Sequence, residues 1–172
     1  LNGLLIVGSD ASQNLIQGNR FGTDVTGTVA MGNRGATIRL SEGALNNTIG
    51  GSTSQAGNVI ANAGWMGVIL FSDAGAGNLI RSNSIFANAA LGIELGRDGV
   101  SVNDEGDADT GANNLQNYPV LTSVASGSGA VVQAALNSAP NATYTVEFFS
   151  NPECDTEGFG EGKTPCLLYT SP

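Results

Sequence analysis

An acidic segment, residues 98–114 (DGVSVNDEGDADTGANN), holds the side chains best suited to chemistry in this sequence. Carboxylates and Asn amides recur along a stretch that contains glycine and lacks an aliphatic period. Ca²⁺ suits such a segment, because it takes about 6–8 oxygen ligands and tolerates irregular geometry. The ligands that we predict for a Ca²⁺ site are Asp104, Asp107, Asp109 and Asn113, with Asn103 and Glu105 as substitutes. The segment lacks the bidentate Glu of an EF-hand loop, and a solvated acidic linker is the alternative interpretation.

Composition limits the other chemistry that is open to the chain. The sequence contains no His, the commonest general base and transition-metal ligand. Residues 1–97 carry five Arg and five carboxylates, so the net charge of −9 falls on the remainder. An acidic surface repels phosphate backbones and anionic lipid, and no apolar run approaches the roughly 20 residues that span a bilayer. We therefore expect no nucleic-acid partner, no membrane span and no required cofactor, with Ca²⁺ as the one ion that the pattern favours.

The scaffold that must position these side chains is visible as an internal repeat. Glycine followed by alternating aliphatic residues recurs at intervals of 32, 32 and 25 residues, at Gly3, Gly35, Gly67 and Gly92. Two further motifs follow in fixed order. Asn-x-Ile begins at Asn14, Asn47 and Asn78, and Asn-x-(Phe/Ile) begins at Asn19, Asn58 and Asn83. The coils differ mainly in loop length, with insertions at residues 22–34 and 50–57.

Each motif alternates with period two over three to five residues, which predicts short strands. Three strands per coil, stacked in parallel from coil to coil, bury an aliphatic core that one coil cannot bury alone. The inward positions predicted for the first strand are Leu4, Ile6, Ala36, Ile38, Val68, Leu70, Ile93 and Leu95. The Asn that heads the second and third strands shares their inward parity, so we expect Asn amides to stack and to bond turn backbone.

The motifs of residues 14–24, Asn47–Gly51 and Asn58–Asn62 resemble those of bacterial right-handed parallel β-helix repeat proteins of the pectin-lyase-like superfamily. The resemblance covers about residues 1–97 and continues into the segment after them. It implies an all-β, right-handed helix with three sheets and about three to four coils. It implies little about activity, because this fold carries lyases, hydrolases, epimerases, phage tailspikes, adhesins and inert surface proteins.

The resemblance also says where catalysis would lie. A lyase would hold Ca²⁺ with clustered carboxylates beside an Arg or Lys base, and a hydrolase would use two or three neighbouring Asp. The outward positions of the first strand motif are Leu5, Thr37, Arg39, Ile69, Phe71 and Glu94. They hold one carboxylate and one Arg, two coils apart, so we predict no catalytic residue in this segment. The side chains that could still converge are Asp24, Arg39, Glu42 and Glu94.

Leu5, Ile69 and Phe71 form an outward apolar set on the same strands. We expect a loop or the following domain to cover them. An exposed patch that binds a partner is the alternative.

Residues 98–172 do not follow the three-motif repeat of residues 1–97. Residues 98–115 are an acidic connector, and residues 116–165 predict a partial antiparallel β-sandwich-like module with strands at 118–124, 130–136 and 143–150. Residues 166–172 (CLLYTSP) fit no earlier pattern and are expected to be a non-native tail. A Cys154–Cys166 bridge is not expected.

The first functional hypothesis is a secreted or cell-surface bacterial scaffold that presents loops for adhesion or binds a polysaccharide or surface glycan. The second is a polysaccharide lyase or glycoside hydrolase whose site lies in missing coils or in the 22–34 loop. The third is a structural spacer with no ligand. Because the chain opens at Leu1 within a repeat, we expect a piece of a longer protein.

Overall fold

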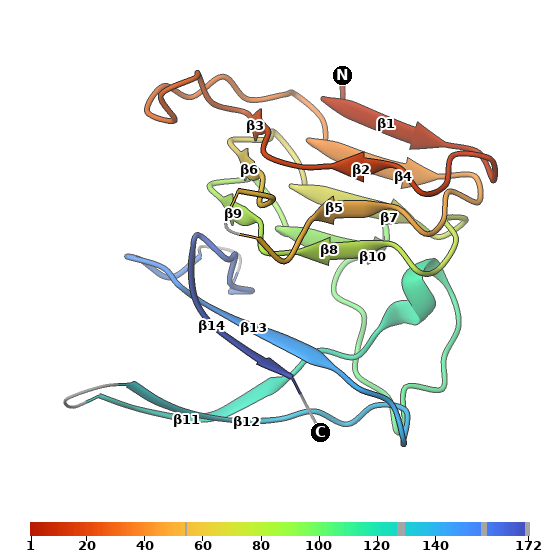
Figure 1. Cartoon of the computed structure of the whole chain (residues 1–172), viewed down its shortest axis with the longest axis vertical. Coiled ribbons are helices and arrows are strands. Elements are labelled where there is room, and N and C mark those ends of the chain that lie inside the picture. The colour runs from red at the N-terminus through yellow and green to blue at the C-terminus, as the bar shows by residue number, and fades with distance from the viewer. Residues whose placement is uncertain (54, 127–129, 156–157, 171–172) are drawn as a thin grey trace.

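The computed structural model describes residues 1–53, 55–126, 130–155 and 158–170. The predicted 50–57 insertion and the 166–172 tail each lie partly outside these residues. The described chain is all-β, with three parallel sheets stacked in one part and two antiparallel strand pairs in the other (Figure 1). This arrangement is compatible with a parallel β-helix.

Each parallel sheet receives one strand from each of the first three coils, and the first sheet receives a fourth strand from the last coil. The first sheet is formed by β1 (Leu4–Val7), β4 (Ile38–Ser41), β7 (Val68–Phe71) and β10 (Ile93–Gly96). The second is formed by β2 (Leu15–Ile16), β5 (Thr48–Gly50) and β8 (Leu79–Arg81). The third is formed by β3 (Arg20–Phe21), β6 (Val59–Ala61) and β9 (Ser84–Phe86). The three-motif repeat predicted from the sequence therefore maps onto these sheets in the predicted order.

The register of the first sheet differs from the one that the glycine spacing predicts. That spacing sets Leu4 beside Ala36, whereas Leu4 pairs with Ile38, Ile38 with Val68 and Val68 with Ile93, at steps of 34, 30 and 25 residues. The prediction was wrong by two residues. An even shift keeps each side chain on its face of the sheet, and it brings Leu40 into the inner column beside Leu70. Leu40 fills more of the interior than Ala36 would.

The interior is a single aliphatic cluster that runs through all coils. Its buried members are Ile6, Ile38, Leu40, Ala44, Ile49, Ile60, Val68, Leu70, Ala74, Ile85 and Ala112. Ile93 was predicted inward but is 44% exposed, because it belongs to the last coil and has no strand beneath it. The final coil therefore leaves part of its apolar floor open.

A second cluster covers the outer face of the first sheet. Buried Ala36, Met66 and Ile69 pack there against the partly buried residues Trp65, Phe71, Ala90 and Leu91. The prediction that Ala36 faces inward was wrong, because β4 begins only at Ile38 and strand alternation does not extend to Ala36. Of the outward apolar set, Ile69 is fully buried, Phe71 is half-buried and Leu5 is 54% exposed. Residues that precede β7 and β10 thus supply much of the cover, and Leu5 on the first coil stays uncovered.

Asparagine side chains form columns at the corners between the sheets, as the motif parity predicted. Buried Asn47 accepts hydrogen bonds from the backbone N–H and the amide of Asn14, at 3.0 and 2.8 Å. It donates in turn to the Asn78 Oδ1 through its own N–H (3.1 Å) and Nδ2 (3.0 Å). Asn19, Asn58 and Asn83 repeat this pattern at the next corner. The buried amides are therefore satisfied by neighbouring coils, since Asn47 and Asn58 donate to the coil below and Asn78 and Asn83 donate to the Ala44 and Ile49 carbonyls of the coil above.

Glycine is required where one of these corners closes. Gly50, with φ of 90°, lies at the end of β5, and a Cβ built there would lie 1.8 Å from the Arg81 carbonyl oxygen. The close approach of consecutive coils leaves no room for a side chain at this position.

After the last coil the chain forms a short 3-10 turn, η1 (Ala112–Leu115), and then two antiparallel pairs. Strand β11 (Val120–Ser126) pairs with β12 (Ala130–Ala135), and β13 (Thr145–Ser150) pairs with β14 (Thr164–Thr170). Three of these strands lie near their predicted positions. The fourth, β14, includes part of the predicted tail, and Cys154 and Cys166 are free and exposed. The two pairs are separate sheets in the described residues.

Within the described residues, no helix has both the length and the apolar character needed to cross a membrane.

Candidate functional site

Three of the four predicted metal ligands lie together. Asp104, Asp107 and Asp109 each place one carboxylate oxygen within 4.8 Å of the carboxylate oxygens of the other two. The three side chains are half-buried. They lie on the connector that leaves the last coil, in a tight loop where Gly106 and Asp107 both have positive φ.

The downstream chain holds this loop in place. Asp107 accepts hydrogen bonds from the backbone N–H of Asn117 (2.9 Å) and from the side chain of Gln116 (2.7 Å), and a further one from the Ser138 hydroxyl. Asp104 accepts from the backbone N–H of Ala108 at 3.0 Å. Asp104 and Asp107 are therefore held by donors from neighbouring residues, and both carboxylate oxygens of Asp107 accept hydrogen bonds.

The electrostatics of the group leave two acceptors unmatched. Burial raises the pKa of Asp109 above its usual value, and the negative charges of Asp104 and Asp107 raise it further. The Oδ1 atoms of Asp104 and Asp109 are buried and have no hydrogen-bond partner. A cation would supply the positive charge that these oxygens lack.

The other predicted ligands are occupied elsewhere. Asn113 bonds through both side-chain atoms to the backbone of Asn78, and Asn103 bonds to the backbone of Tyr118 in the same way. Glu105 is exposed. Asn113 follows Asn78 by 35 residues, close to the spacing of the first corner column, and this spacing was the sequence signal that pointed to its role.

Asp24, one of the weak catalytic candidates, serves to close the loop that contains it. Its carboxylate accepts hydrogen bonds from the Thr26 hydroxyl (2.7 Å) and from the backbone N–H groups of Thr28 (3.0 Å) and Val29 (3.1 Å). The Thr26 hydrogen bond makes the largest contribution to lowering the pKa of Asp24, to about 2. Such a carboxylate is a poor general base near neutral pH.

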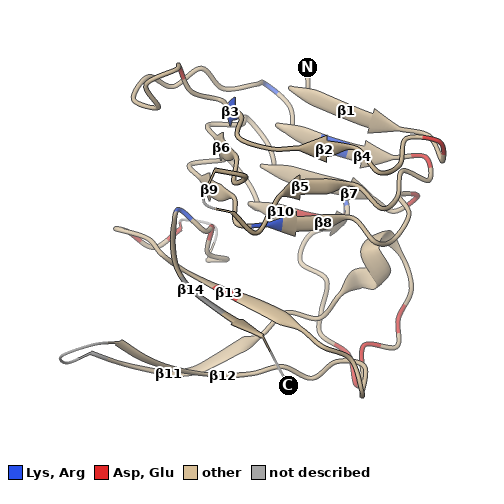
Figure 2. Ribbon diagram, in the orientation of Figure 1, with Lys and Arg blue, Asp and Glu red and all other residues tan. Residues whose placement is uncertain are grey.

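The remaining catalytic candidates are not joined to one another. The Arg39 guanidinium carbon lies 3.8 Å from the centre of the Phe71 ring, and Glu94 is buried and accepts from the Gly99 N–H at 2.8 Å. Glu42 is exposed in the turn after β4, one of the turns after β1, β4 and β7 that carry acidic residues (Figure 2). No hydrogen bond or ion pair recorded in the described part of the chain links any two of Asp24, Arg39, Glu42 and Glu94.

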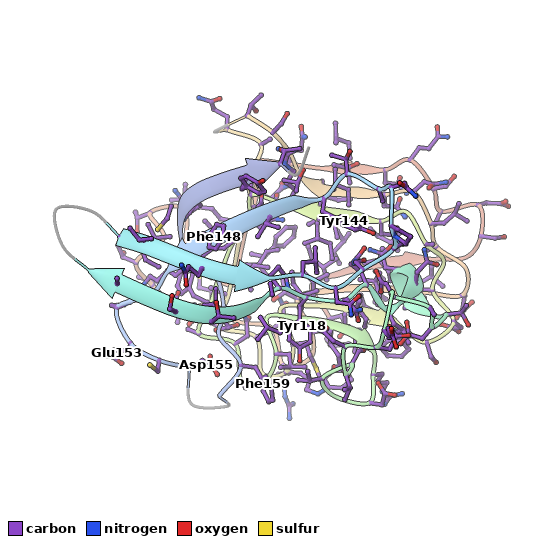
Figure 3. All side chains as sticks on the ribbon, turned by 90° about the horizontal axis from the view of Figure 1, so that it is seen from below. Tyr118, Tyr144, Phe148, Glu153, Asp155 and Phe159 are labelled. Carbon is purple, nitrogen blue, oxygen red and sulfur yellow. The ribbon has the colours of Figure 1, made fainter. Side chains whose placement is uncertain are left out.

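A cavity of about 770 Å³ lies between the last coil and the antiparallel strands. Its floor is the open apolar end of the coil stack, formed by Ile80, Ile85, Ile93 and Leu95. Aromatic residues from separate segments line the rest, among them Tyr118, Phe148 and Phe159 (Figure 3). No sequence pattern indicates this cavity, because its aromatic residues do not recur at any regular spacing.

Three carboxylates also line the cavity. Glu147 accepts from the backbone N–H and hydroxyl of Ser82, both at 2.8 Å, and lies 3.6 Å from the Arg81 Nε. Glu161 accepts from Asn88, and burial raises the pKa of this carboxyl group. Glu94 keeps one buried oxygen, Oε2, without a partner. The cavity can therefore receive a molecule that has apolar faces and hydrogen-bond donors.

Comparisons of the chain with protein-family models, with curated proteins and with solved structures each found no match.

Proposed function

We propose that this chain is part of a right-handed parallel β-helix of the pectin-lyase-like kind, with a β-sandwich-like module after it, and that it is a secreted or cell-surface scaffold that binds a glycan. The aromatic cavity with its unpartnered Glu94 oxygen is the observation that carries the binding role. Handedness and superfamily come from the motif resemblance.

The chemistry of the cavity favours a sugar over a purely apolar ligand. Sugar rings present apolar C–H faces that pack on aromatic rings, and their hydroxyl groups donate to carboxylates. Tyr118 and Phe159 are each about half exposed, so their rings are accessible from solvent. Glu94 adds one buried acceptor atom, Oε2, which has no hydrogen-bond donor in the free chain and therefore gains from a ligand donor, while its Oε1 accepts from the Gly99 N–H.

Catalysis is not part of the proposal for these residues. A retaining or inverting hydrolase needs a pair of carboxyl groups flanking the scissile bond. One is protonated and acts as general acid, and the other is ionised and acts as nucleophile or general base. Asp24 and Glu147 are engaged by their own neighbours, and Glu94 is joined to the Gly99 backbone. A lyase or hydrolase whose site lies outside these coils stays the alternative.

Binding of defined oligosaccharides, followed by saturation-transfer NMR, tests the scaffold proposal. We expect Tyr118→Ala to weaken the binding of a responding oligosaccharide at least tenfold, since its ring lines the cavity. Tyr169→Ala is the matched control, because Tyr169 is similarly exposed (53% against 46%) and does not line the cavity. Equal loss in both variants, or no oligosaccharide that binds, contradicts glycan binding and leaves the spacer hypothesis.

We also propose that Asp104, Asp107 and Asp109 bind Ca²⁺. The two buried carboxylate oxygens without partners support this, and water or backbone oxygens would complete the ligand set. Thermal melting with and without millimolar CaCl₂ tests it, because a ligand of the folded state raises the melting temperature. Asp109→Asn should abolish the shift and Asp98→Asn, an exposed neighbour in the same segment, should keep it. An identical melting temperature with and without CaCl₂ removes the site.

A further inference from the structure

The charged residues that line the cavity between the last coil and the antiparallel strands are all acidic. They are Glu94, Glu147 and Glu161, and no Lys or Arg of the described chain lines it. Glu147 has a positive partner, because its Oε1 lies 3.6 Å from the Arg81 Nε. Glu94 and Glu161 have no ion-pair partner among the described residues. The cavity therefore contains two carboxylates whose negative charge the protein does not balance.

Both of these residues lie in the protein interior, next to the same strand. Glu94 belongs to β10 and is 2% exposed, and Glu161 is 8% exposed. A Cβ built on Gly92, the residue before β10, would lie 3.5 Å from the Glu161 Oε1. Glu161 therefore reaches the start of the strand that carries Glu94. An ionised carboxylate in such a place is costly unless a counter-charge accompanies it.

Neutral donors compensate these two carboxylates only in part. Gly99 donates its N–H to the Glu94 Oε1 at 2.8 Å, while Oε2 is buried and has no partner. Asn88 donates its N–H and its amide to the Glu161 oxygens, at 3.2 and 2.7 Å. Burial nevertheless raises the pKa of Glu161, so these two donors do not offset the loss of water. A positive group on a ligand would complete the compensation at both residues.

The cations that lie nearest to the two carboxylates in the sequence are engaged outside the cavity. The only Lys of the chain, Lys163, places its ammonium 4.7 Å from the centre of the Phe86 ring. The Arg97 guanidinium carbon lies 4.9 Å from the centre of the Phe71 ring. Neither Lys163 nor Arg97 lines the cavity. The counter-charge is therefore left for a ligand to supply.

The aromatic side chains of the cavity favour the same kind of ligand. Tyr118, Phe148 and Phe159 come from three segments and line it (Figure 3). The face of an aromatic ring attracts a cation and also packs against the C–H groups of a sugar. A sugar that carries a protonated amine therefore matches the rings and the carboxylates together. A sugar that carries a carboxylate would add a third unbalanced negative charge and is disfavoured.

We infer that the glycan bound in this cavity is an amino sugar, whose protonated amine lies against Glu94 and Glu161. The inference rests on the glycan-binding role proposed above and names the class of glycan. An ammonium group brings three N–H donors and a full positive charge, so it can both bond to the Glu94 Oε2 and neutralise the carboxylate. A sugar hydroxyl brings a single neutral donor.

The test compares three tetrasaccharides by isothermal titration calorimetry at about pH 6, where a sugar amine, like an α-amino group, is protonated and a uronate is ionised. They are a β-1,4-linked glucosamine tetramer, its N-acetylated counterpart and tetragalacturonate. We expect the amine to bind roughly tenfold or more tightly than the N-acetylated sugar, and the uronate to bind weakest. Equal affinity for the first two, or a preference for the uronate, overturns the inference and leaves glycan binding in place. No binding of any of the three contradicts the glycan-binding role itself.

The variant Glu94→Gln tests whether the charge of this carboxylate sets the preference. Gln keeps the shape of the side chain and an oxygen that accepts the Gly99 N–H, so binding of the N-acetylated tetramer should change little. The roughly tenfold preference for the amine should disappear. Glu153→Gln is the matched control, because Glu153 is exposed and does not line the cavity, and it should keep the preference. A preference retained in Glu94→Gln overturns the inference, and if that variant does not fold, the ranking of the three sugars on the native chain decides it.

Discussion

The Asn113 side chain accepts a hydrogen bond from the Asn78 N–H at 2.8 Å and returns one to the Asn78 carbonyl at 2.7 Å. Asn113 belongs to the acidic connector, yet it occupies the place that the repeat would give to the corresponding Asn of the next coil. The connector therefore continues the corner column by one residue after the strands have ended.

Asn113→Ala should lower the free energy of unfolding by about 1–3 kcal/mol, because it leaves the Asn78 N–H and carbonyl without partners. Asn114→Ala is a matched control. Both residues adopt the left-handed backbone conformation, with φ of 51° and 58°, so each substitution carries a similar backbone penalty. Chemical denaturation measures both. Equal destabilisation would show that backbone conformation, not the hydrogen-bond pair, accounts for the effect.

Leu40→Ala should destabilise the chain by about 2–5 kcal/mol, the usual range for a fully buried Leu in a core that cannot collapse. Leu5→Ala, on the exposed face of the first coil, should cost less than about 1 kcal/mol. The comparison also tests whether Leu40 lies in the inner column beside Leu70. A Leu40 variant as stable as the Leu5 variant would contradict this buried position.

Periodicity predicted the stack well because a coil repeats the same physical problem. Alternating aliphatic residues and an inward Asn recur at each coil, so the three sheets and the corner columns follow from spacing alone. The register of β4 did not follow, because a glycine marks the approach to a strand and its distance from the strand varies from coil to coil. Leu4 pairs two residues beyond the glycine-based prediction. The even shift left the strand residues Ile38, Val68 and Leu70 on their predicted inner face, whereas Ala36, which precedes β4, packs on the outer face.

The sites were predicted less completely. Asp104, Asp107 and Asp109 are close in sequence, so a short loop brings them together. Glu147 and Glu161 act on residues 65 and 73 positions away, and no local pattern reports such contacts. Asn113 was assigned to the metal site because its side chain offers an oxygen ligand within an acidic segment. Its spacing from Asn78, however, is close to that of the asparagine column at the first corner. Chemical type alone does not decide between two roles for one side chain.

Asp24 should titrate at about pH 2 in a carbon-detected NMR experiment, below its usual value of 3.8. Because the folded-state pKa is lowered, the stabilisation from its ionised form is present above pH 3.8 and is lost as pH falls through 2. Thr26→Val removes the hydroxyl that contributes most and should raise the pKa of Asp24 toward 3.8. Thr28→Val keeps the backbone donor and should change it little. A pKa of Asp24 that is unaffected by Thr26→Val would rule out this cause.

Asp104→Asn should lower the pKa of Asp109, which burial raises first and the charges of Asp104 and Asp107 raise further. Asn can still accept the Ala108 N–H bond, so the loop geometry is expected to persist. A raised folded-state pKa means that stability from this group falls as pH rises from the unfolded value through the folded one, and the variant should flatten that fall. NMR titration of Asp109 in the native chain, in Asp104→Asn and in Asp98→Asn measures the difference. Ca²⁺ bound by Asp104, Asp107 and Asp109 should also lower the pKa of Asp109, because a divalent cation attracts the ionised carboxylate. Millimolar CaCl₂ should therefore lower this pKa in the native chain by more than the Asp104→Asn substitution does. A pKa that moves equally in Asp104→Asn and Asp98→Asn would show that net charge, not proximity within the group, controls this carboxylate.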